Sequence, residues 1–554
     1  MSPEQFIDTL KGFPLEKVNR ELEKVCGIVD FFDSEDYALT VEQSQSNRVE
    51  YGDWQTNFEL AKKVCLLLKG QGNNPKIVIE PTCGIGNFIL ASAIVFRNSI
   101  KQIYGIEIYK PYIQQLKYRI LKYGLCNPGV IKCKIKLLHH NIFDFSFNIL
   151  NIPQNENLLL LGNPPWITIS KLGKINSENL PRKSNFKKSK GLDAITGKGN
   201  FDIAEYISYQ LLDYFHRYDA CLAFLVKSSV AKNIVYEQRN EKYKISHMHQ
   251  YNINAKKEFD VSVAASLFVA YLGKGNAKQC EIKDFYQPKE SIMYGWVNSN
   301  FVSNTKDYFV YSRLDGYCQL DWWSGIKHDC SKIMELEKEN SRLYNKLHEE
   351  VNIEDDLLYP ILKSSDLKTT MVESFRKYVI VTQNSPSDNT ESLKERLPRT
   401  YDYLDSHSDY FESRASVIYR DRSRFSIFGI GPYSFKNYKI AISGLYKTTL
   451  FSLISPINGK CVMLDDTCYL MGFDNVDDAK CFLKILNSNI VQKFLKSIVF
   501  FDAKRSINKD ILMRIDLLTS IEDLARDNYI NEDEYSRAKQ YILTHGKKRL
   551  TGLI

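Results

Sequence analysis

Apolar and polar residues change their spacing several times along the first half of the chain. Residues 58 to 69, FELAKKVCLLLK, carry apolar side chains at helical spacing, and GQGNNPK ends that helix. Short strands follow at KIVIE, KQIYGIEIY and KIKLLHH, with a glycine turn and apolar helix after the first and the helical PYIQQLKYRILKYGL after the second. A fourth strand, LLLL, covers residues 158 to 161. Strands and helices alternating at this length predict an α/β fold, a Rossmann-like doubly wound sheet that is largely parallel.

The pattern changes further along the chain. NFDIAEYISYQLLDYF predicts a helix, ACLAFLVKSSVA a buried strand, and SLFVAYLGKG, residues 266 to 275, the last strand of this unit. From about residue 286 short mixed segments predict an α+β domain. We therefore expect a helical extension over 1–47, the α/β domain over 48–285 and a second domain over 286–554.

Composition narrows the class of protein. The chain has 554 residues, 44% hydrophobic and 25% charged, as in ordinary soluble proteins, and its net charge of +8 mildly favours a polyanionic partner. Its 12 cysteines form no CxxC pair, which predicts reduced thiols and no metal site. The start, MSPEQFIDTLKGF, is no secretory signal, and no apolar run is long enough to span a membrane. We expect a cytoplasmic protein that does not bind membranes.

The first candidate site is the glycine turn Glu80-Pro81-Thr82-Cys83-Gly84-Ile85-Gly86. It is neither GxGxxG nor a phosphate loop, because no Gly-Lys-Ser/Thr follows. It places an acid at a strand end and then two glycines that let the backbone approach a ligand, which suits a cofactor with an amino group and little phosphate. Glu107, at the end of the second strand, is placed to accept hydrogen bonds from both hydroxyls of a ribose. An ordinary strand-to-helix turn and a solvated acid would have the same sequence.

The second candidate site is Asn163-Pro164-Pro165-Trp166, directly after the fourth strand. The Asn163 amide oxygen and the Pro164 carbonyl are two neighbouring acceptors that can hold both hydrogens of an exocyclic amine, while Trp166 stacks on the ring that bears it. Two prolines make the turn stiff, so the acceptors are positioned in advance. A strand that merely stops at Pro-Pro does not explain why Asn and Trp flank the prolines.

With EPTCGIG, GIE and NPPW in this order, the chain resembles the gamma-class, TaqI-like, S-adenosylmethionine-dependent N6-adenine DNA methyltransferases. The motifs cover roughly residues 50 to 275. The resemblance implies methyl transfer from S-adenosylmethionine to N6 of a flipped-out adenine in double-stranded DNA, and residues 286–554 as a target-recognition domain. It also implies the modification enzyme of a restriction-modification system, with a cognate restriction endonuclease as candidate partner; we expect a monomer.

The resemblance also assigns residues. WQTNFELA and KKEFDVSVAASLFVAYL resemble family segments, and HHNIFDF holds the place of the family's Asp, with Asp144 as the alternative to Asn141 if the register slips. Phe259 would stack on the base opposite Trp166, although a plain core Phe would look the same. The implied cofactor-binding residues are Thr56, Glu80, Pro81, Thr82, Gly84, Gly86, Glu107, Asn141, Phe143 and Asn163, and the implied catalytic residues are Asn163, Pro164, Pro165, Trp166 and Phe259.

Two basic segments are candidates for DNA contact. They comprise Lys183, Lys187, Lys188 and Lys190 after the NPPW turn, and Arg414, Arg420, Arg422 and Arg424 in the second domain. We expect most of them to neutralise phosphates, although a solvated charged face would have the same composition. A glutamine methyltransferase could use the same turn, but the long, centrally basic carboxyl-terminal region argues against it. An inactive DNA-binding protein is disfavoured by the intact motifs, and a fused nuclease by the absence of an acid-x-Lys core.

Overall fold

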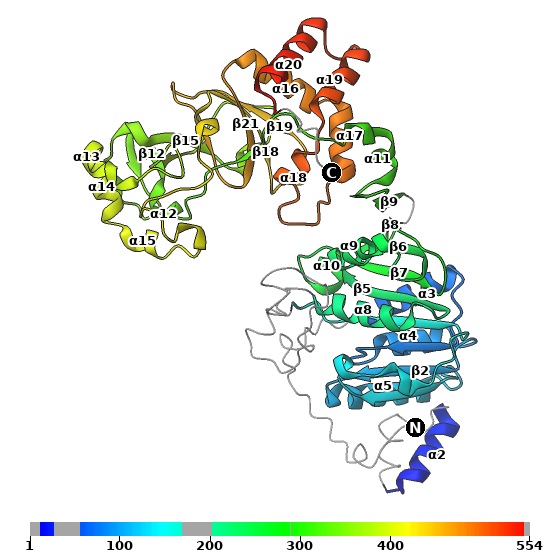
Figure 1. Ribbon diagram of the computed structural model, residues 1–554. Coiled ribbons are helices and arrows are strands. Elements are labelled where there is room, and N and C mark those ends of the chain that lie inside the picture. Colours follow the sequence, from blue (N-terminus) through cyan, green and yellow to red (C-terminus); the bar gives the residue numbers. More distant parts are fainter. Residues whose placement is uncertain (1–11, 27–55, 169–201, 288–289, 548–554) are drawn as a thin grey trace. The chain divides into compact units, whose positions relative to one another are not determined.

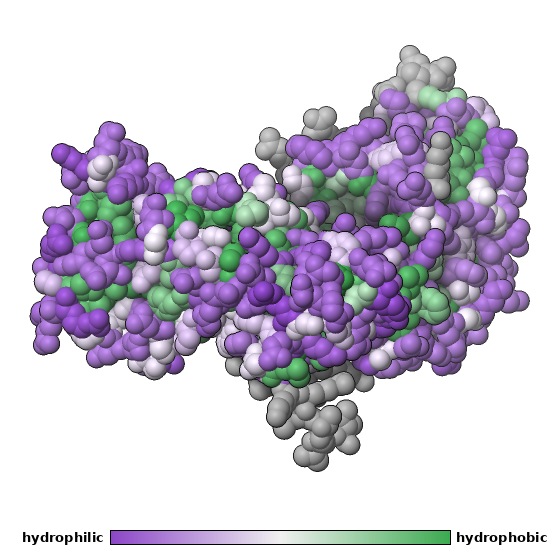
Figure 2. All heavy atoms as spheres, turned by 90° about the horizontal axis from the view of Figure 1, so that it is seen from above, coloured by the Kyte–Doolittle hydropathy of each residue, from purple (hydrophilic) through white to green (hydrophobic). Residues whose placement is uncertain are grey.

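The computed structural model describes residues 12–26, 56–168, 202–287 and 290–547, which are coloured in Figure 1. The chain divides into two compact units, Met1–Phe301 and Val302–Ile554, and each is described by itself. No helix in the described ranges is long and apolar enough to cross a membrane. Figure 2 shows a largely hydrophilic surface with small hydrophobic areas.

The first unit is built on one sheet in the order β10-β9-β8-β6-β7-β5-β4-β1-β2-β3. The five strands from β3 to β5 are parallel, and β7 is antiparallel to both β5 and β6. The strands are β1 (Ile77–Glu80), β2 (Gln102–Glu107), β3 (Lys134–His139), β4 (Leu158–Gly162), β5 (Ala220–Lys227), β6 (Ile245–Ile253), β7 (Ala265–Leu272), β8 (Gln279–Asp284), β9 (Ser291–Val297) and β10 (Asn300–Val302). The doubly wound α/β fold predicted from the sequence is confirmed.

Helices cover both faces of this sheet. The crossovers β1→β2 and β2→β3 run in one direction along the sheet and β4→β5 runs in the other, so right-handed connections place α4 and α5 on one face and α8 on the opposite one. All five residues of β4 are consequently buried. The helices are α2 (Leu15–Cys26), α3 (Phe58–Gly70), α4 (Asn87–Val95), α5 (Lys110–Cys126), α8 (Ile203–Phe215), α9 (Ser228–Glu237) and α10 (Ala255–Phe259).

One sequence expectation needs correction. The segment 266–275 is not the last strand, because β8 pairs with β6 and β9 pairs with β8. The two compact units are divided at Phe301/Val302, and the sequence expectation for the domains was 285/286. Both added strands lie toward the sheet edge and are only partly buried, so they lack the continuous apolar run of the central strands.

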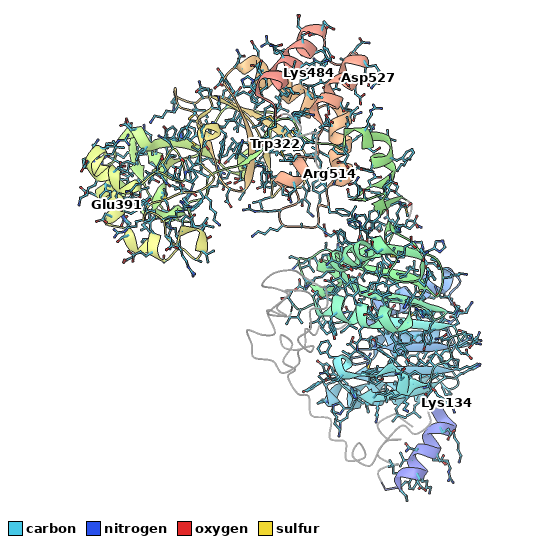
Figure 3. The ribbon with its side chains drawn as sticks, viewed as in Figure 1. Lys134, Trp322, Glu391, Lys484, Arg514 and Asp527 are labelled. Carbon is cyan, nitrogen blue, oxygen red and sulfur yellow. The ribbon has the colours of Figure 1, made fainter. Side chains whose placement is uncertain are left out.

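The second unit contains two sheets and a group of carboxyl-terminal helices, as expected for an α+β domain. The sheet orders are β11-β21-β18-β19-β16 and β14-β13-β12-β17-β15-β20. Trp322, labelled in Figure 3, is fully buried in this unit. Its strands are β11 (Trp323–Ser324), β12 (Glu335–Glu339), β13 (Arg342–Tyr344), β14 (Glu350–Val351), β15 (Leu358–Leu362), β16 (Met371–Val372), β17 (Lys377–Ile380), β18 (Tyr438–Ser443), β19 (Phe451–Ile454), β20 (Met463–Leu464) and β21 (Cys468–Phe473). Its helices are α11 (Thr305–Tyr311), α12 (Ser331–Met334), α13 (Leu393–Arg396), α14 (Pro398–Asp405), α15 (Ser408–Glu412), α16 (Val476–Leu486), α17 (Asn489–Ile498), α18 (Lys509–Leu512), α19 (Leu517–Arg526) and α20 (Glu532–His545).

Candidate functional site

The glycine turn joins β1 to α4 at the carboxyl end of the sheet. Glu80 ends β1 and is only 3% exposed; burial, with a further contribution from the neighbouring Glu107 charge, raises its pKa well above the ordinary value. Gly84 and Gly86 have φ angles of 51° and 75°, in the left-handed region that favours glycine. A Cβ at Gly86 would lie 2.0 Å from Cδ1 of Leu116, so only glycine lets this turn pack against α5.

Glu107 ends β2 and lies beside this turn. Its Oε2 accepts a hydrogen bond from the Gly84 backbone N–H at 2.8 Å, and its Oε1 accepts one from the Tyr109 N–H at 2.9 Å. The carboxylate therefore ties the turn after β1 to the end of β2.

Thr56 is held against the same turn by residues that the sequence did not single out. The Asn87 side-chain amide donates to the Thr56 carbonyl at 2.6 Å, and Arg119 donates to Asn87 Oδ1 at 2.7 Å and also to the Ile85 carbonyl. Asn87 begins α4 directly after Gly86, which caps the helix without a side-chain bond. An asparagine beside a glycine cap was the only signal available for this role.

Three buried polar atoms around the turn make no hydrogen bond within the described residues. They are Thr56 Oγ1, Glu80 Oε2 and Thr82 Oγ1. A buried polar atom without a partner costs about 1 to 3 kcal/mol, so three of them around one turn indicate a polar ligand. Two hydroxyl donors and one carboxylate acceptor suit an amino-acid moiety, and the residues present fit the methionine part of S-adenosylmethionine.

The third predicted contact region follows β3. Asn141 is half-buried, and its Oδ1 caps the short turn Ile142–Asp144 by accepting a hydrogen bond from the Phe143 N–H at 3.0 Å. The Phe143 ring lies edge-on to Tyr206, with centroids 5.5 Å apart. Asp144, the alternative to Asn141, is exposed.

The NPPW turn begins beside the glycine turn. A Cβ at Gly162, the last residue of β4, would lie 3.5 Å from Cγ of Glu80 and 3.8 Å from Cδ of Pro81. Asn163 and Pro165 are half-buried, and Pro164 is buried. The glycine turn and the NPPW turn therefore adjoin at the ends of the paired strands β1 and β4.

Trp166 is fixed at both its ring and its backbone. It is 7% exposed, and its indole Nε1 donates to the Leu225 carbonyl at 3.1 Å. The Lys227 ammonium donates to the Trp166 carbonyl at 3.0 Å and to Asp202 Oδ2 at 2.5 Å. The chain thus braces the NPPW turn from β5.

Asp202 completes this brace and was also missed. Its Oδ1 accepts from the Ala204 N–H at 3.0 Å as the cap of α8, and its backbone forms an antiparallel bridge with Thr168. Burial raises the pKa of Asp202 although the Lys227 charge opposes that shift. A lysine that ends the apolar strand ACLAFLVK and an aspartate that precedes a helix were the only sequence signals.

The structure brings Trp166 and Phe259 together, but not as a sandwich. Their ring centroids are 5.0 Å apart with an interplanar angle of 65°, so no planar base fits between them in this conformation. Phe259 is buried at the end of α10, and Asp260 beyond it has a φ of 55°. The expected ring-base-ring stack would require one of the two rings to move.

The lysines and arginines that the sequence offered as DNA contacts differ in their exposure and in their partners. The lysines between Lys183 and Lys190 lie outside the described residues. Arg414 is not a free surface charge, because it donates to the backbone carbonyls of His328 at 3.3 Å, Phe411 at 3.0 Å, Arg424 at 2.7 Å and Ser426 at 2.8 Å. Arg424 pairs with Asp405 at 2.5 Å. Arg420 and Arg422 are exposed.

Within the described residues no group of three or more His, Cys, Asp or Glu side chains is arranged to hold a metal ion. The cysteines of this part of the chain are unpaired thiols, most of them buried. Cys83 lies in the glycine turn itself, and burial, reinforced by Glu107 and Glu80, raises the pKa of its thiol well above the ordinary value. This thiol is therefore neutral and a weak nucleophile.

The known proteins that match this chain include a relative in sequence and a solved structure of similar fold. The type II methyltransferase M.NspV of Nostoc sp. is 37% identical over 478 residues, which cover 85% of this chain and 97% of the relative. The type IIL restriction-modification enzyme MmeI, solved in complex with DNA, superposes with a TM-score of 0.52 at 12% identity, over 98% of this chain and 75% of that one. No family model matches the sequence.

Proposed function

The chain belongs to the type II DNA methyltransferases of restriction-modification systems, whose methyl donor is S-adenosylmethionine, and from this premise we propose that it methylates N6 of a flipped-out adenine in double-stranded DNA. The arrangement of Asn163 to Trp166 beside Glu80 carries this proposal. An amide oxygen, a prolyl carbonyl and an aromatic ring at the end of a buried strand match an amine on a flat ring.

The chain's own residues would do the following work. The Asn163 oxygen and the Pro164 carbonyl accept the two hydrogens of the amine and turn the nitrogen lone pair away from the ring. The amine becomes nucleophilic through orientation and through stabilisation of the positive charge that develops on it, so no titrating base is needed before transfer. When bound, S-adenosylmethionine supplies an electrophilic methyl group.

The cofactor site follows from the glycine turn. We assign the amino-acid moiety to Glu80, Thr82 and Thr56, because Glu80 Oε2 and the two threonine hydroxyls are buried and make no hydrogen bond within the described residues. We assign the ribose to Glu107 and the adenine of the cofactor to the turn that Asn141 caps, with Phe143 beside it. Pro81, Gly84 and Gly86 shape the backbone that approaches the ligand.

Two observations favour an amine over a ring carbon as the target. Methylation of a cytosine ring carbon needs a covalent nucleophile, and the cysteine of this site, Cys83, is buried and protonated. The NPPW turn offers acceptors instead. The N4 amine of cytosine presents the same two hydrogens, so the experiment has to distinguish two amines.

The test is product analysis. The protein is incubated with S-adenosylmethionine carrying a labelled methyl group and with genomic DNA that lacks modified bases, and nucleosides are identified by mass spectrometry. We expect N6-methyladenine, its loss in Asn163→Ala, and no loss in the matched control Asn127→Ala, which caps α5. N4-methylcytosine as the product would overturn the adenine assignment, and full activity of Asn163→Ala would overturn the role of the turn.

The same experiment addresses the partners. Mapping the methylated positions along the DNA would give the recognition sequence, and we expect a double-stranded site. We also propose that the enzyme acts as a monomer and protects DNA from a cognate restriction endonuclease. Light scattering of the active protein tests the first statement, and resistance of the methylated DNA to that endonuclease tests the second.

A further inference from the structure

The second unit presents an unusual surface between α15 and β18. Val417 is 63% exposed and Ile418 is 37% exposed, and they lie side by side in the short turn Val417–Tyr419. Arg420 and Arg422 follow and are exposed as well. We name residues 415–424 the arginine loop. Val417 and Ile418 thus form a small exposed apolar area bordered by exposed arginines.

This loop is held in shape from inside. The Arg414 guanidinium lies 3.7 Å from the centroid of the Tyr419 ring, in addition to its four bonds to backbone carbonyls. The Tyr419 hydroxyl donates to the Lys327 carbonyl at 3.2 Å. A half-buried arginine thus orders the loop, and Val417 and Ile418 are displayed on a preorganised turn. Preorganisation lowers the entropic cost of binding.

The base of the loop borders an open cavity of about 660 Å³. Arg414, Ala415 and Ser416 form one part of its lining, and Lys327 and Lys332 form another. Lys327 pairs with Asp329 at 3.3 Å, whereas the Lys332 ammonium lies 5.7 Å from the Tyr410 ring centroid. Arg420, Arg422 and Lys332 make no ion pair with any residue that the structure describes. This surface is positive next to an apolar tip, although Asp421 lies between the two arginines.

We propose that the second unit binds the DNA duplex through the arginine loop. This proposal rests on the proposed function and assigns a DNA-binding surface to it. Val417 and Ile418 contact base edges in a groove, where the C5 methyl of thymine is the apolar group available to them. Arg420, Arg422 and Lys332 neutralise backbone phosphates. Charge complementarity with a polyanion makes DNA, rather than a protein, the occupant.

The experiment measures binding of the full-length protein, with its cofactor product present, to a labelled duplex that contains the methylated site and to a scrambled duplex. Salt is varied from about 50 to 200 mM, the range over which counterion release changes affinity strongly. We expect Arg420→Ala, Arg422→Ala and Lys332→Ala each to make the slope of log affinity against log salt less negative by about 0.9, on both duplexes. Val417→Ser with Ile418→Ser should weaken binding to the site roughly tenfold and leave the scrambled duplex unchanged.

Matched controls lie elsewhere in the same unit. Phe309→Ser with Val310→Ser removes another exposed apolar pair, on α11, and Arg537→Ala removes an exposed arginine on α20, which Figure 1 shows far from α15. Both should bind like the wild type. Because all substituted side chains are exposed, thermal unfolding should stay unchanged and show that each variant is folded.

The outcomes separate this inference from the proposed function. Wild-type affinity and salt slope in all loop variants, with adenine methylation intact in the wild type, would overturn the inference alone. Equal loss on both duplexes in the Val417/Ile418 variant would overturn the groove contact. A methylated base other than adenine would overturn the proposed function, while the binding results would still decide the inference.

Discussion

Replacing Lys227 by Met removes the brace of the NPPW turn and little else. The methionine keeps most of the apolar stem of the lysine side chain but loses the ammonium that donates to the Trp166 carbonyl and to Asp202. The Lys227 side chain is 22% exposed and that of Asp202 is 9% exposed, so this is a largely buried ion pair. The variant leaves a carboxylate and a carbonyl without their donor.

The magnitude follows from what is left behind. Removing one partner of a buried ion pair costs about 3 to 5 kcal/mol, because the other charge stays buried without compensation. Asp202 keeps its bond from the Ala204 N–H, and the Lys227 site is partly open, so we expect the lower end, about 3 kcal/mol of unfolding free energy. Asp202→Asn in the Lys227→Met background removes the stranded charge and should recover most of the loss.

The stability loss should depend on pH. Burial raises the pKa of Asp202 in the folded protein, and without Lys227 it rises further. A carboxyl group with a raised folded pKa favours folding while it is protonated, and this contribution is lost as pH rises from the ordinary value through the raised one. Lys227→Met should therefore be least destabilised at acidic pH, and the double variant with Asn should not show this trend.

The assays separate stability from catalysis. Denaturant unfolding of the wild type, both single variants and the double variant gives the coupling energy. Single-turnover methyl transfer and cofactor affinity give the functional part: a shift of about 1 Å in the turn would slow transfer about 100-fold, while cofactor binding stays unchanged. A Lys227→Met enzyme with wild-type transfer rate and stability would refute the brace.

Three further predictions concern other parts of the chain. Burial raises the pKa of Glu80, so protonated Glu80 stabilises the fold at pH values below the ordinary pKa, and this stabilisation is lost as pH rises through the raised pKa. Cofactor binding should release a proton, which titration calorimetry in buffers of different ionisation enthalpy measures. Glu80→Gln should abolish this proton release. Gly86→Ala places a side chain at a left-handed φ and in a clash with Leu116. It should lower the unfolding free energy by about 2 to 4 kcal/mol, as measured by denaturant unfolding, and weaken cofactor affinity, as measured by equilibrium binding. In the second unit burial favours neutral Glu335, but hydrogen bonds from His328 and Lys363 hold its pKa well below the ordinary value. The ionised Glu335 therefore stabilises the fold fully above the ordinary pKa, and this stabilisation is lost as pH falls. Glu335→Gln should lower the unfolding free energy by about 3 kcal/mol at neutral pH and by less in acid, as measured by unfolding at both pH values.

The central sheet was predictable because its physics is local. Strands buried on both faces must be continuously apolar, and β4 and β5 are. The edge strands were not predictable in this way. β8 and β9 mix exposed and buried positions, so no continuous apolar run marks them, and the sequence prediction ended the sheet at residue 275. β6 was missed because ISHMHQYNI carries two histidines within a strand.

The places of the motif residues at strand ends could be predicted from the sequence, but the residues that contact them could not. Recognisable sequence motifs at strand ends contain Glu80, Glu107 and Trp166. Lys227 acts on Trp166 across 61 residues and on Asp202 across 25, so neither contact leaves a local pattern. Arg414 shows the converse error: its position among arginines and aromatic residues predicted a phosphate contact, yet its partners are four carbonyls brought together by the fold.

The contact between Trp166 and Phe259 differs from the arrangement that the sequence implied for these two rings. The sequence implied a base between two rings, and the structure shows the rings against each other. Such an aromatic pair contributes about 0.5 to 1.5 kcal/mol beyond its buried area, which is comparable to the roughly 1 to 3 kcal/mol that one ring gains by stacking on a base. Exchanging the ring contact for a base is therefore close to neutral. Trp166 is fixed by its indole bond to Leu225 and by Lys227, whereas Phe259 ends a five-residue helix at Asp260, a residue with positive φ. Phe259 is consequently the ring that yields, and Phe259→Ala should weaken base capture without weakening the hold on Trp166.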